Sequence, residues 1–411
     1  MEKIEATYRI VTPMFCGGAE QPAEFRLPSF KGVLRFWWRA LEWGRIQDLA
    51  KLRKEEAELF GSSDEGQSRF LMRLTQLPSD VKLSEDFSPG LTYLAGMGLC
   101  RANGQFHRHP LKPGELVTVE IRVKGGGRSV ADLSQLRRVL IAMGIFGGIG
   151  ARTRRGFGSL TLDAIDGASP AWAQAKSVDA LKSQIGELLT VSRDNKSSES
   201  PFTAFSHVSH IVLVEGDAGD SAQGLLDKIG RELIRYRSYG ASRRDGRRFN
   251  VLGEEVTKPN FPDDHDSVHS FLAKGTPVAS PPKRAAFGLP HNYFFKSLSS
   301  PDVNVKAEVT PEKHDRRASP LFLHIHAPVG AAPIAICTLM PSRFLPEGES
   351  LRVSDQSYDK NRKRRRTSPS TSTIPQVDFL KPIHDFLDRL TSRSEIKESF
   401  GRIEQLEVPH G

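Results

Sequence analysis

Apolar and polar residues follow two different periods through the first half of the chain. Strand-like alternation, with every second residue apolar, occupies the segments 4–11, 93–99, 116–123 and 157–162. Helical spacing of apolar residues occupies 29–43 and 133–144. In chain order these segments are strand, helix, strand, strand, helix, strand. This order predicts a ferredoxin-like βαββαβ unit, the topology of common RNA-recognition modules.

A similar order begins again after a polar, serine-rich stretch at residues 191–201. Strand, helix, strand and strand patterns follow at 207–214, 224–237, 320–326 and 333–339, and a closing helix is expected over 376–393. The sequence therefore predicts an α+β protein of two ferredoxin-like (RRM-like) domains, over residues 1–190 and 202–411.

Two long segments, 240–285 and 353–375, interrupt the second predicted domain without a regular period. Irregular segments of this length inside compact domains are usually functional or mobile. The second one contains the run KNRKRRR at 360–366, followed by TSPSTST. We expect a solvated, mobile segment there.

Composition excludes several classes of protein. Hydrophobic residues make up 38% of the 411 residues and charged residues 26%, which is ordinary for a globular protein. No stretch approaches the roughly 20 apolar residues of a membrane span, and the N-terminus lacks the pattern of a secretory signal. We therefore expect a cytoplasmic protein without a membrane partner. Cys16, Cys100 and Cys337 lie far apart, which supports neither a zinc ribbon nor a disulfide framework.

Positive charge is modest in total but concentrated in places. The chain carries 58 Lys and Arg against 49 Asp and Glu, a formal net charge of +9. Residues 231–249 hold seven arginines, two acids and three aromatic residues. Cations interleaved with stacking rings are typical of nucleic-acid surfaces, which makes Arg243 and Arg244 candidate RNA contacts. Exposed arginines also serve protein interfaces, so this segment stays undecided between RNA and protein contact.

The predicted helix at 29–43 has two chemically different faces. Its apolar residues recur every three or four positions and form a face that can pack on a sheet. Lys31, Arg35 and Arg39 recur every fourth position on another face, and no acid lies between residues 25 and 41. Such a row can match phosphates along a strand, and the helix N-terminus at Ser29 adds backbone donors. The alternative is a solvated amphipathic helix face.

A second candidate is the glycine-rich segment at 144–160, which reads GIFGGIGARTRRGFGSL. It is not a P-loop, because no Gly-Lys-Ser/Thr follows, and Thr153 stands where a dinucleotide fingerprint needs its last glycine. Its bare backbone can approach a nucleic-acid strand closely, and Arg152, Arg154 and Arg155 supply positive charge. The alternative is a glycine-rich hairpin with solvated arginines.

Four segments of the first half carry a family resemblance. They read TPMFCGGA, EFRLPSFKGVLRFWWRAL, LFGSSDEGQSR and GGIGARTRRGFGS. Together with AFGLP at 286–290 and RRASPLFLHIH at 316–326, they resemble the RAMP superfamily, specifically the first-subunit family of the type III-B CRISPR effector, the Cmr complex. The segment 240–285 and the chain beyond 342 carry no part of the resemblance.

This resemblance implies two ferredoxin-like domains in an antiviral ribonucleoprotein. The subunit would hold the 3′ part of the guide (CRISPR) RNA, contact the paired target RNA, and lie next to other RAMP subunits. Matched to the family's motifs, the residues expected at the RNA are Lys31, Arg35, Trp38, Arg39, Arg152, Arg154 and Arg155. Because cations would grip mainly backbone, binding should be salt-sensitive and largely indifferent to sequence.

Catalysis is not expected in this chain. Metal-free RNA cleavage needs a base and an acid, and the nearest candidates are the pairs His107 with His109 and His207 with His210. We interpret them as strand or loop histidines, because no third partner is identifiable. In the resembled complex, target cleavage belongs to a different subunit. The alternatives are a RAMP endoribonuclease that processes guide RNA, and a scaffold without RNA contact.

The segment PDDHDSVH at 262–269 places two histidines four apart among three aspartates and could bind a metal. A metal site on an unstructured loop lacks the rigid support that its ligands need. We therefore expect a turn or a mobile segment there, with no metal and no cofactor.

Overall fold

A computed structural model describes residues 2–17, 23–79, 83–126, 128–166, 172–190, 200–256, 258–359, 371–374 and 379–407. The fold is mixed α+β with several antiparallel sheets, as expected. The chain forms two compact units that do not follow chain order. The first comprises Met1–Gly230, Leu321–Pro341 and Arg389–Gly411, and the second comprises Arg231–Pro320 and Ser342–Asp388.

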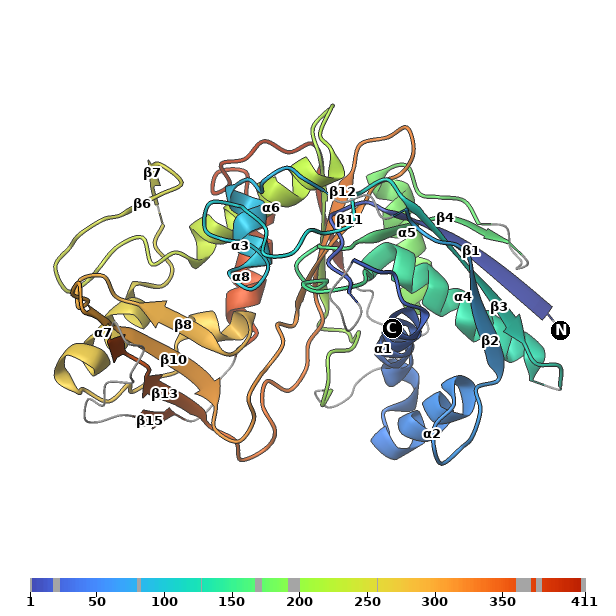
Figure 1. Cartoon of the computed structure of the whole chain (residues 1–411), viewed down its shortest axis with the longest axis horizontal. Coiled ribbons are helices and arrows are strands. Elements are labelled where there is room, and N and C mark those ends of the chain that lie inside the picture. The colour runs from blue at the N-terminus through green and yellow to red at the C-terminus, as the bar shows by residue number, and fades with distance from the viewer. Residues whose placement is uncertain are drawn as a thin grey trace. The chain divides into compact units, whose positions relative to one another are not determined.

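The first unit begins with a four-stranded sheet in the order β2-β3-β1-β4, in which all neighbouring strands are antiparallel. Its strands are β1 (Glu2–Ile10), β2 (Phe70–Gln76), β3 (Leu116–Val123) and β4 (Leu160–Asp166). Alternate residues of β1, such as Ile4 and Tyr8, are buried. Helices α1 (Leu27–Ile46) and α4 (Ser129–Phe146) cover that face (Figure 1), and the Tyr8 hydroxyl donates to the Leu140 carbonyl of α4.

The predicted strand at 93–99 is wrong. Those residues include the end of helix α3 (Pro89–Ala95), which has proline in its first turn and ends at Gly96, where φ is 68°. The second strand of the sheet is instead β2, which follows a further helix, α2 (Leu49–Phe60). Only Phe70 of β2 is fully buried, so its alternation is weak in the sequence.

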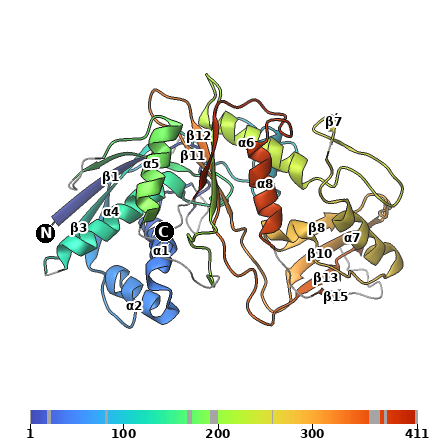
Figure 2. The same ribbon diagram turned by 180° about the vertical axis from the view of Figure 1, so that it is seen from behind.

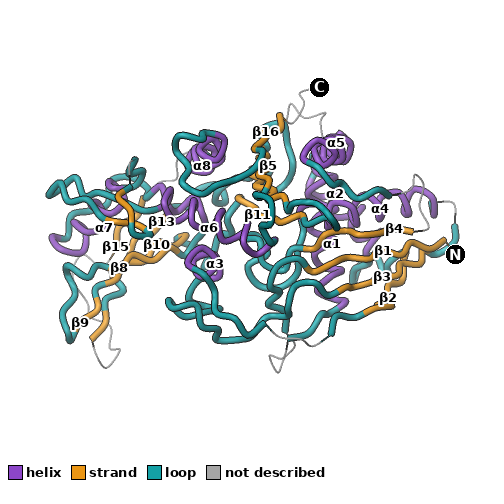
Figure 3. Tube along the Cα trace, turned by 90° about the horizontal axis from the view of Figure 1, so that it is seen from above, coloured by secondary structure: helices purple, strands orange, loops and turns teal. Residues whose placement is uncertain are grey.

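A second sheet in the first unit has the order β11-β12-β5-β16 and is also antiparallel throughout. Its strands are β5 (His210–Glu215), β11 (Leu321–His326), β12 (Ile334–Leu339) and β16 (Ile403–Glu407). Numbered one to four along the chain, they repeat the two-three-one-four order of the first sheet. In Figure 3 the strands of the first sheet lie side by side in the order β4, β1, β3 and β2.

The strands of the second sheet and the helices between them form a second series, in which the helices stand at the same places in the chain order as in the first. Helix α6 (Ala222–Arg237) follows β5, and helix α8 (Lys381–Thr391) lies between β12 and β16 in the chain. Helix α5 (Val178–Leu189) precedes β5 and contacts α4. The predicted junction at 191–201 falls within the first unit, with residues 191–199 outside the described part, so two domains divided there remain a prediction.

The second unit is built from the long segments between these strands. Its sheet has the order β15-β13-β10-β8 (Figures 1 and 2), with β8 (His291–Phe294), β10 (Lys306–Pro311), β13 (Leu351–Asp355) and β15 (Thr371–Ile374). Residues predicted to be irregular within 240–285 contain helix α7 (Pro262–Lys274), with Pro262 at its start and Gly275 at its end. The segment also holds the short strands β6 (Asn250–Val251) and β7 (Glu254–Glu255) and part of the 3-10 helix η2 (Lys283–Phe287). A further short pair is β9 (Val303–Asn304) with β14 (Tyr358–Asp359).

The basic run at 360–366 lies outside the described residues. None of the helices in the described part of the chain is long and apolar enough to cross a membrane.

Candidate nucleic-acid interface

The exposed face of the first sheet is occupied by an ion network centred on Glu120. Arg73, Arg122 and Lys3 all contact the Glu120 carboxylate, which is 1% exposed. Hydrogen bonds from Arg73, then from Arg122 and Lys3, outweigh burial and lower the pKa of Glu120 to about 2. RNA-recognition modules place stacking aromatic rings on this face. Here the middle of this face carries charged side chains that are paired with one another, and it offers no ring for a base to stack on.

Helix α1 has the two faces that its sequence predicts. Phe30, Leu34, Trp37 and Leu41 are buried in the core. The helix ends at Gln47, which adopts a left-handed conformation with φ 49°. Lys31, Arg35 and Arg39 lie on the other side and are each partly exposed.

The cationic face of α1 is not free of acids, which corrects the sequence prediction. Glu56 of α2 lies against it, 6% exposed, and accepts Arg35 Nε at 2.6 Å and Arg39 Nη1 at 2.8 and 3.0 Å. Arg35 also donates to the Gly61 carbonyl. One carboxylate therefore holds two guanidinium groups, and the net charge of the three side chains is +1. No local pattern around α1 points to this acid, because it comes from the next helix.

Lys31 and Trp38 also differ from the expected roles. The Lys31 Nζ lies 5.3 Å from the centroid of the Phe70 ring, and burial, with Arg35 nearby, lowers the pKa of Lys31. Trp38 is 1% exposed, and its indole nitrogen donates to Gln135 Oε1 at 2.8 Å. A buried and hydrogen-bonded indole cannot stack on a base, so Trp38 is a core residue and not an RNA contact.

Two arginines of the glycine-rich segment bind the end of helix α3. Arg152 Nε donates to the Ala95 carbonyl at 2.9 Å, and Arg155 Nη1 donates to the Leu94 carbonyl at 3.2 Å. Cations are favourable there, because the last carbonyls of a helix carry partial negative charge. Arg152 has φ 64° and remains exposed. The arginines thus fix the loop, and Arg152 keeps part of its surface open to solvent.

The Arg154 guanidinium lies against two aromatic rings. Its guanidinium carbon is 4.5 Å from the centroid of Phe322 and 5.6 Å from that of Phe36, and Nη2 donates to the Thr203 hydroxyl. Phe36 comes from α1 and Phe322 from β11. A planar cation held against rings keeps its charge while presenting an edge to a ligand.

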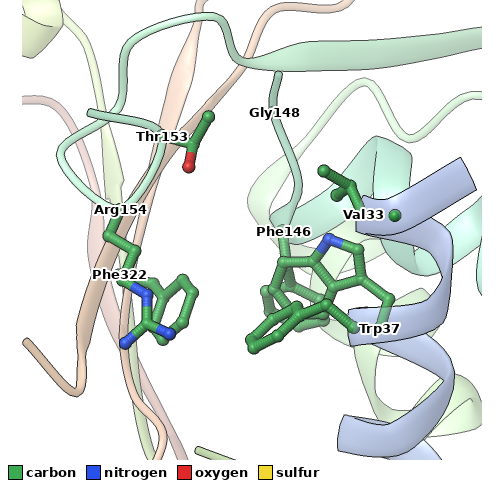
Figure 4. A pocket seen from close by; sticks show the side chains of 9 residues that line it. Val33, Trp37, Phe146, Gly148, Thr153, Arg154 and Phe322 are labelled. Carbon is green, nitrogen blue, oxygen red and sulfur yellow. The ribbon is translucent and has the colours of Figure 1, made fainter. Parts of the chain in front are cut away.

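A pocket of about 180 Å³ lies where helix α1 meets the glycine-rich loop. Figure 4 shows Thr153 and Arg154 of the loop across from Val33 and Trp37 of the helix. The lining residues are Gly32, Val33, Phe36, Trp37, Phe146, Gly148, Thr153, Arg154 and Phe322. The two elements singled out in the sequence therefore converge. They meet through the Gly32 side of α1, and the row of Lys31, Arg35 and Arg39 contacts α2 and β2 instead.

The two arginine candidates of the second unit have their own partners. Arg243 lies 3.2 Å from Asp263, with both side chains largely exposed, and the backbone amides of Arg243 and Arg244 donate to Asp266. Arg244 Nη1 lies 3.0 Å from both ring nitrogens of His269. The pocket belongs to the first unit, whereas Arg243 and Arg244 belong to the second. RNA contact by these two arginines remains a prediction.

The histidine candidates are dispersed. His210 begins β5 and is buried, His207 is partly exposed, and His109 Nδ1 lies 2.9 Å from the Leu83 carbonyl. The PDDHDSVH segment is the start of α7, in which His265 contacts Asp266. No group of three or more His, Cys, Asp or Glu side chains in the described ranges is arranged to hold a metal ion.

Part of the chain matches a known protein family. Residues 7–161, which contain helix α1 and the glycine-rich loop, match the model of the RAMP superfamily. This part of the chain therefore resembles the RAMP superfamily.

The chain also resembles Cmr1 of the type III-B CRISPR Cmr complex. It is 33% identical over 144 residues to the CRISPR system Cmr subunit Cmr1-1 of Pyrococcus furiosus. The match covers 34% of this chain and 40% of that protein, so less than half of the relative is spanned.

Solved structures extend the similarity of fold beyond this segment. The crystal structure of Cmr1 from Pyrococcus furiosus in its apo form matches with a TM-score of 0.53 at 16% identity, over 98% of both chains. A chain in the cryo-EM structure of the type III-B Cmr-beta bound to cognate target RNA has 12% identity. It covers 84% of this chain and 97% of that one, with a TM-score of 0.47.

Proposed function

We propose that this protein is an RNA-binding, non-catalytic subunit of a type III-B CRISPR effector ribonucleoprotein. It holds the 3′ region of the guide RNA and the paired target RNA, and it assembles with other RAMP subunits. The proposal is supported by the similarity to a Cmr subunit over the segment that contains helix α1 and the glycine-rich loop.

Two ferredoxin-like domains with long insertions form the framework of this proposal. The order two-three-one-four in both sheets of the first unit is the order of the ferredoxin-like fold, and helices follow the first and third strands in each series. The second unit corresponds to the insertions of the second series. This interpretation explains why the compact units do not follow chain order.

The observation that carries the proposal is the position of Arg154 in the pocket at helix α1, with Arg152 on the same loop. Arg154 presents a guanidinium against two rings, and Arg152 is exposed at a positive-φ turn of the same loop. Cations next to aromatic rings and bare glycine backbone bind single-stranded nucleic acid with little sequence preference. Arg155 fixes the loop. Arg35 and Arg39 add a net positive charge on helix α1, and because both bind Glu56, each should contact RNA more weakly.

The residues that line the pocket support a non-catalytic role. Among the described residues that line the pocket, none is a His, Lys, Tyr, Asp or Glu that could exchange a proton near neutral pH. The alternative ribonuclease would need His207 and His210, and His210 is buried in the second sheet. The pair therefore lacks an exposed acid and base side by side.

The proposal is tested with purified protein and single-stranded RNA of repeat and spacer sequence. Fluorescence anisotropy should show binding that weakens steeply with salt, and a denaturing gel should show that the bound RNA stays intact. Cleavage that is lost in the variant His207→Ala/His210→Ala would support the ribonuclease instead. Protein that binds no RNA at low salt would favour a scaffold.

A further inference from the structure

The arginines of the glycine-rich loop lie on a turn, residues 152–156, whose end is held by two buried hydroxyl groups. We call these residues the arginine turn. The carbonyl of Gly156 accepts a hydrogen bond from Thr12 Oγ1 at 2.6 Å and another from Ser159 Oγ at 2.9 Å. Thr12 is 0% exposed and Ser159 is 1% exposed. The end of the turn therefore cannot move without breaking hydrogen bonds that water cannot replace.

Both hydroxyl groups also accept a hydrogen bond, which joins the turn to two sheets. Thr12 Oγ1 accepts from the Ser159 amide at 2.9 Å, at the start of β4. Ser159 Oγ accepts from the Ile325 amide of β11 at 3.2 Å. Each hydroxyl thus uses its hydrogen and a lone pair, and three segments that are distant in the sequence meet at the Gly156 carbonyl.

The middle of the arginine turn is fixed to the same strand. The Leu323 amide of β11 donates to the Arg154 carbonyl at 3.0 Å. The Arg154 guanidinium carbon lies 4.5 Å from the ring centroid of Phe322, the preceding residue of that strand. The main chain and the side chain of Arg154 are therefore both placed relative to β11. A turn that shifts on this strand would carry the guanidinium away from Phe322.

We propose that Thr12 and Ser159 are positioning residues for RNA binding, whose hydroxyl groups hold the arginine turn so that Arg152 and Arg154 meet phosphates together. The inference rests on the proposed RNA binding and names two residues that act through the arginines, because both are buried. Cations on an ordered turn lose less conformational entropy when they bind, so the affinity for RNA should depend on the order of the turn.

The chain offers variants that separate positioning from general stability. Thr12→Val replaces the hydroxyl with a methyl group of similar size, and Thr12→Ser keeps the hydroxyl. Ser159→Ala removes the second hydroxyl. The matched control is Thr161→Val, because Thr161 is also 0% exposed and its hydroxyl also accepts a β11-side amide, that of Ala327 at 3.0 Å, but it lies in β4 outside the turn.

The first measurement is affinity for single-stranded RNA by fluorescence anisotropy at fixed salt, with thermal unfolding to confirm that each variant is folded. Thr12→Val and Ser159→Ala should each bind about fivefold more weakly than wild type. Thr12→Ser and Thr161→Val should stay within about twofold of wild type. Should Thr12→Val not fold, Ser159→Ala makes the same comparison with the same expected loss.

The second measurement is a double-mutant cycle with the arginines. In a chain that already carries Arg152→Gln/Arg154→Gln, Thr12→Val should cause no further loss of affinity, because the hydroxyl acts through these side chains. A loss of the same size in both backgrounds would mean that Thr12 weakens binding by another route, and the inference would be wrong.

Wild-type affinity in both Thr12→Val and Ser159→Ala would also overturn the inference, and it would leave the proposed function standing. The same holds if Thr161→Val weakens binding as much as Thr12→Val does, because buried hydroxyl groups in general would then be responsible. Wild-type protein that binds no RNA at low salt would overturn both the inference and the proposed function.

Discussion

Arg39 on helix α1 donates to both carboxylate oxygens of Glu56 on helix α2, at 2.8 and 3.0 Å. Because Arg35 donates to the same carboxylate, Glu56 joins two helices and limits what either arginine can offer to RNA. The pairing turns a predicted binding row into a partly structural one, and its contribution can be measured.

Glu56→Gln should lower the free energy of unfolding by about 1 to 2 kcal/mol in urea denaturation. The change removes the charge that two arginines share, and each arginine is about one third exposed, which reduces the cost. Glu55→Gln is the matched control, because Glu55 is 30% exposed and pairs only with Arg45 among the ion pairs described. It should change stability by less than about 0.5 kcal/mol. Equal effects of the two variants would show that the pairing of Glu56 with Arg35 and Arg39 stabilises the fold no more than the pairing of Glu55 with Arg45.

Trp38→Phe should cost about 1 kcal/mol of stability without changing RNA affinity. The variant keeps most of the buried ring but removes the hydrogen bond to Gln135. Thermal unfolding and anisotropy on the same sample measure both effects. A fall in affinity with unchanged stability would restore Trp38 as an RNA contact.

Glu120 should make stability depend on acid pH. Its pKa falls from an ordinary value of 4.5 to about 2, so its contribution is present above pH 4.5 and is lost as pH falls toward 2. Glu120→Gln removes this contribution. Urea unfolding should show a larger stability difference between wild type and variant at pH 5 than at pH 3. A constant difference would mean that Arg73, Arg122 and Lys3 do not stabilise the charged carboxylate.

His324 on β11 should destabilise the fold as pH falls below neutral. It is 1% exposed, neither ring nitrogen has a hydrogen-bond partner of good geometry in the described part of the chain, and burial, with His326 nearby, lowers its pKa to about 3. Below pH 6.5 the His324 ring binds a proton in the unfolded chain but stays neutral in the folded chain. His324→Leu should therefore gain stability relative to wild type by up to about 1.4 kcal/mol per pH unit below 6.5. A pH-independent difference would contradict a buried neutral ring.

The strands were easier to predict from the sequence than the details of the surface. Periodicity placed β1, β3, β4, β5, β11 and β12 within a few residues, because β1 alternates between buried and partly exposed residues and the others are mostly buried. It missed β2 and β16, whose alternation is weak, and it missed α7, where a proline at the first turn and two acids look like a turn.

The side of helix α1 that faces the glycine-rich loop was not predictable from the sequence. Both elements stood out by their cations, but the pocket between them is lined on the helix by Gly32, Val33, Phe36 and Trp37. Glu56 and Phe322 come from α2 and β11, and no local pattern relates them to α1. Such partners are set by tertiary packing, which a helical period on one segment does not reveal.

The most direct test of the central claim is the salt dependence of RNA affinity in a charge-matched pair of double variants. Arg152→Gln/Arg154→Gln removes two cations of the glycine-rich loop, and Arg53→Gln/Lys54→Gln removes two exposed cations of α2. The slope of log affinity against log salt changes by about 0.7 per phosphate contact for single strands. We predict that the first variant shows a slope shallower by about 1.4, twice that value, and that the second keeps the wild-type slope. An unchanged slope in Arg152→Gln/Arg154→Gln, with the protein still folded, would contradict the account.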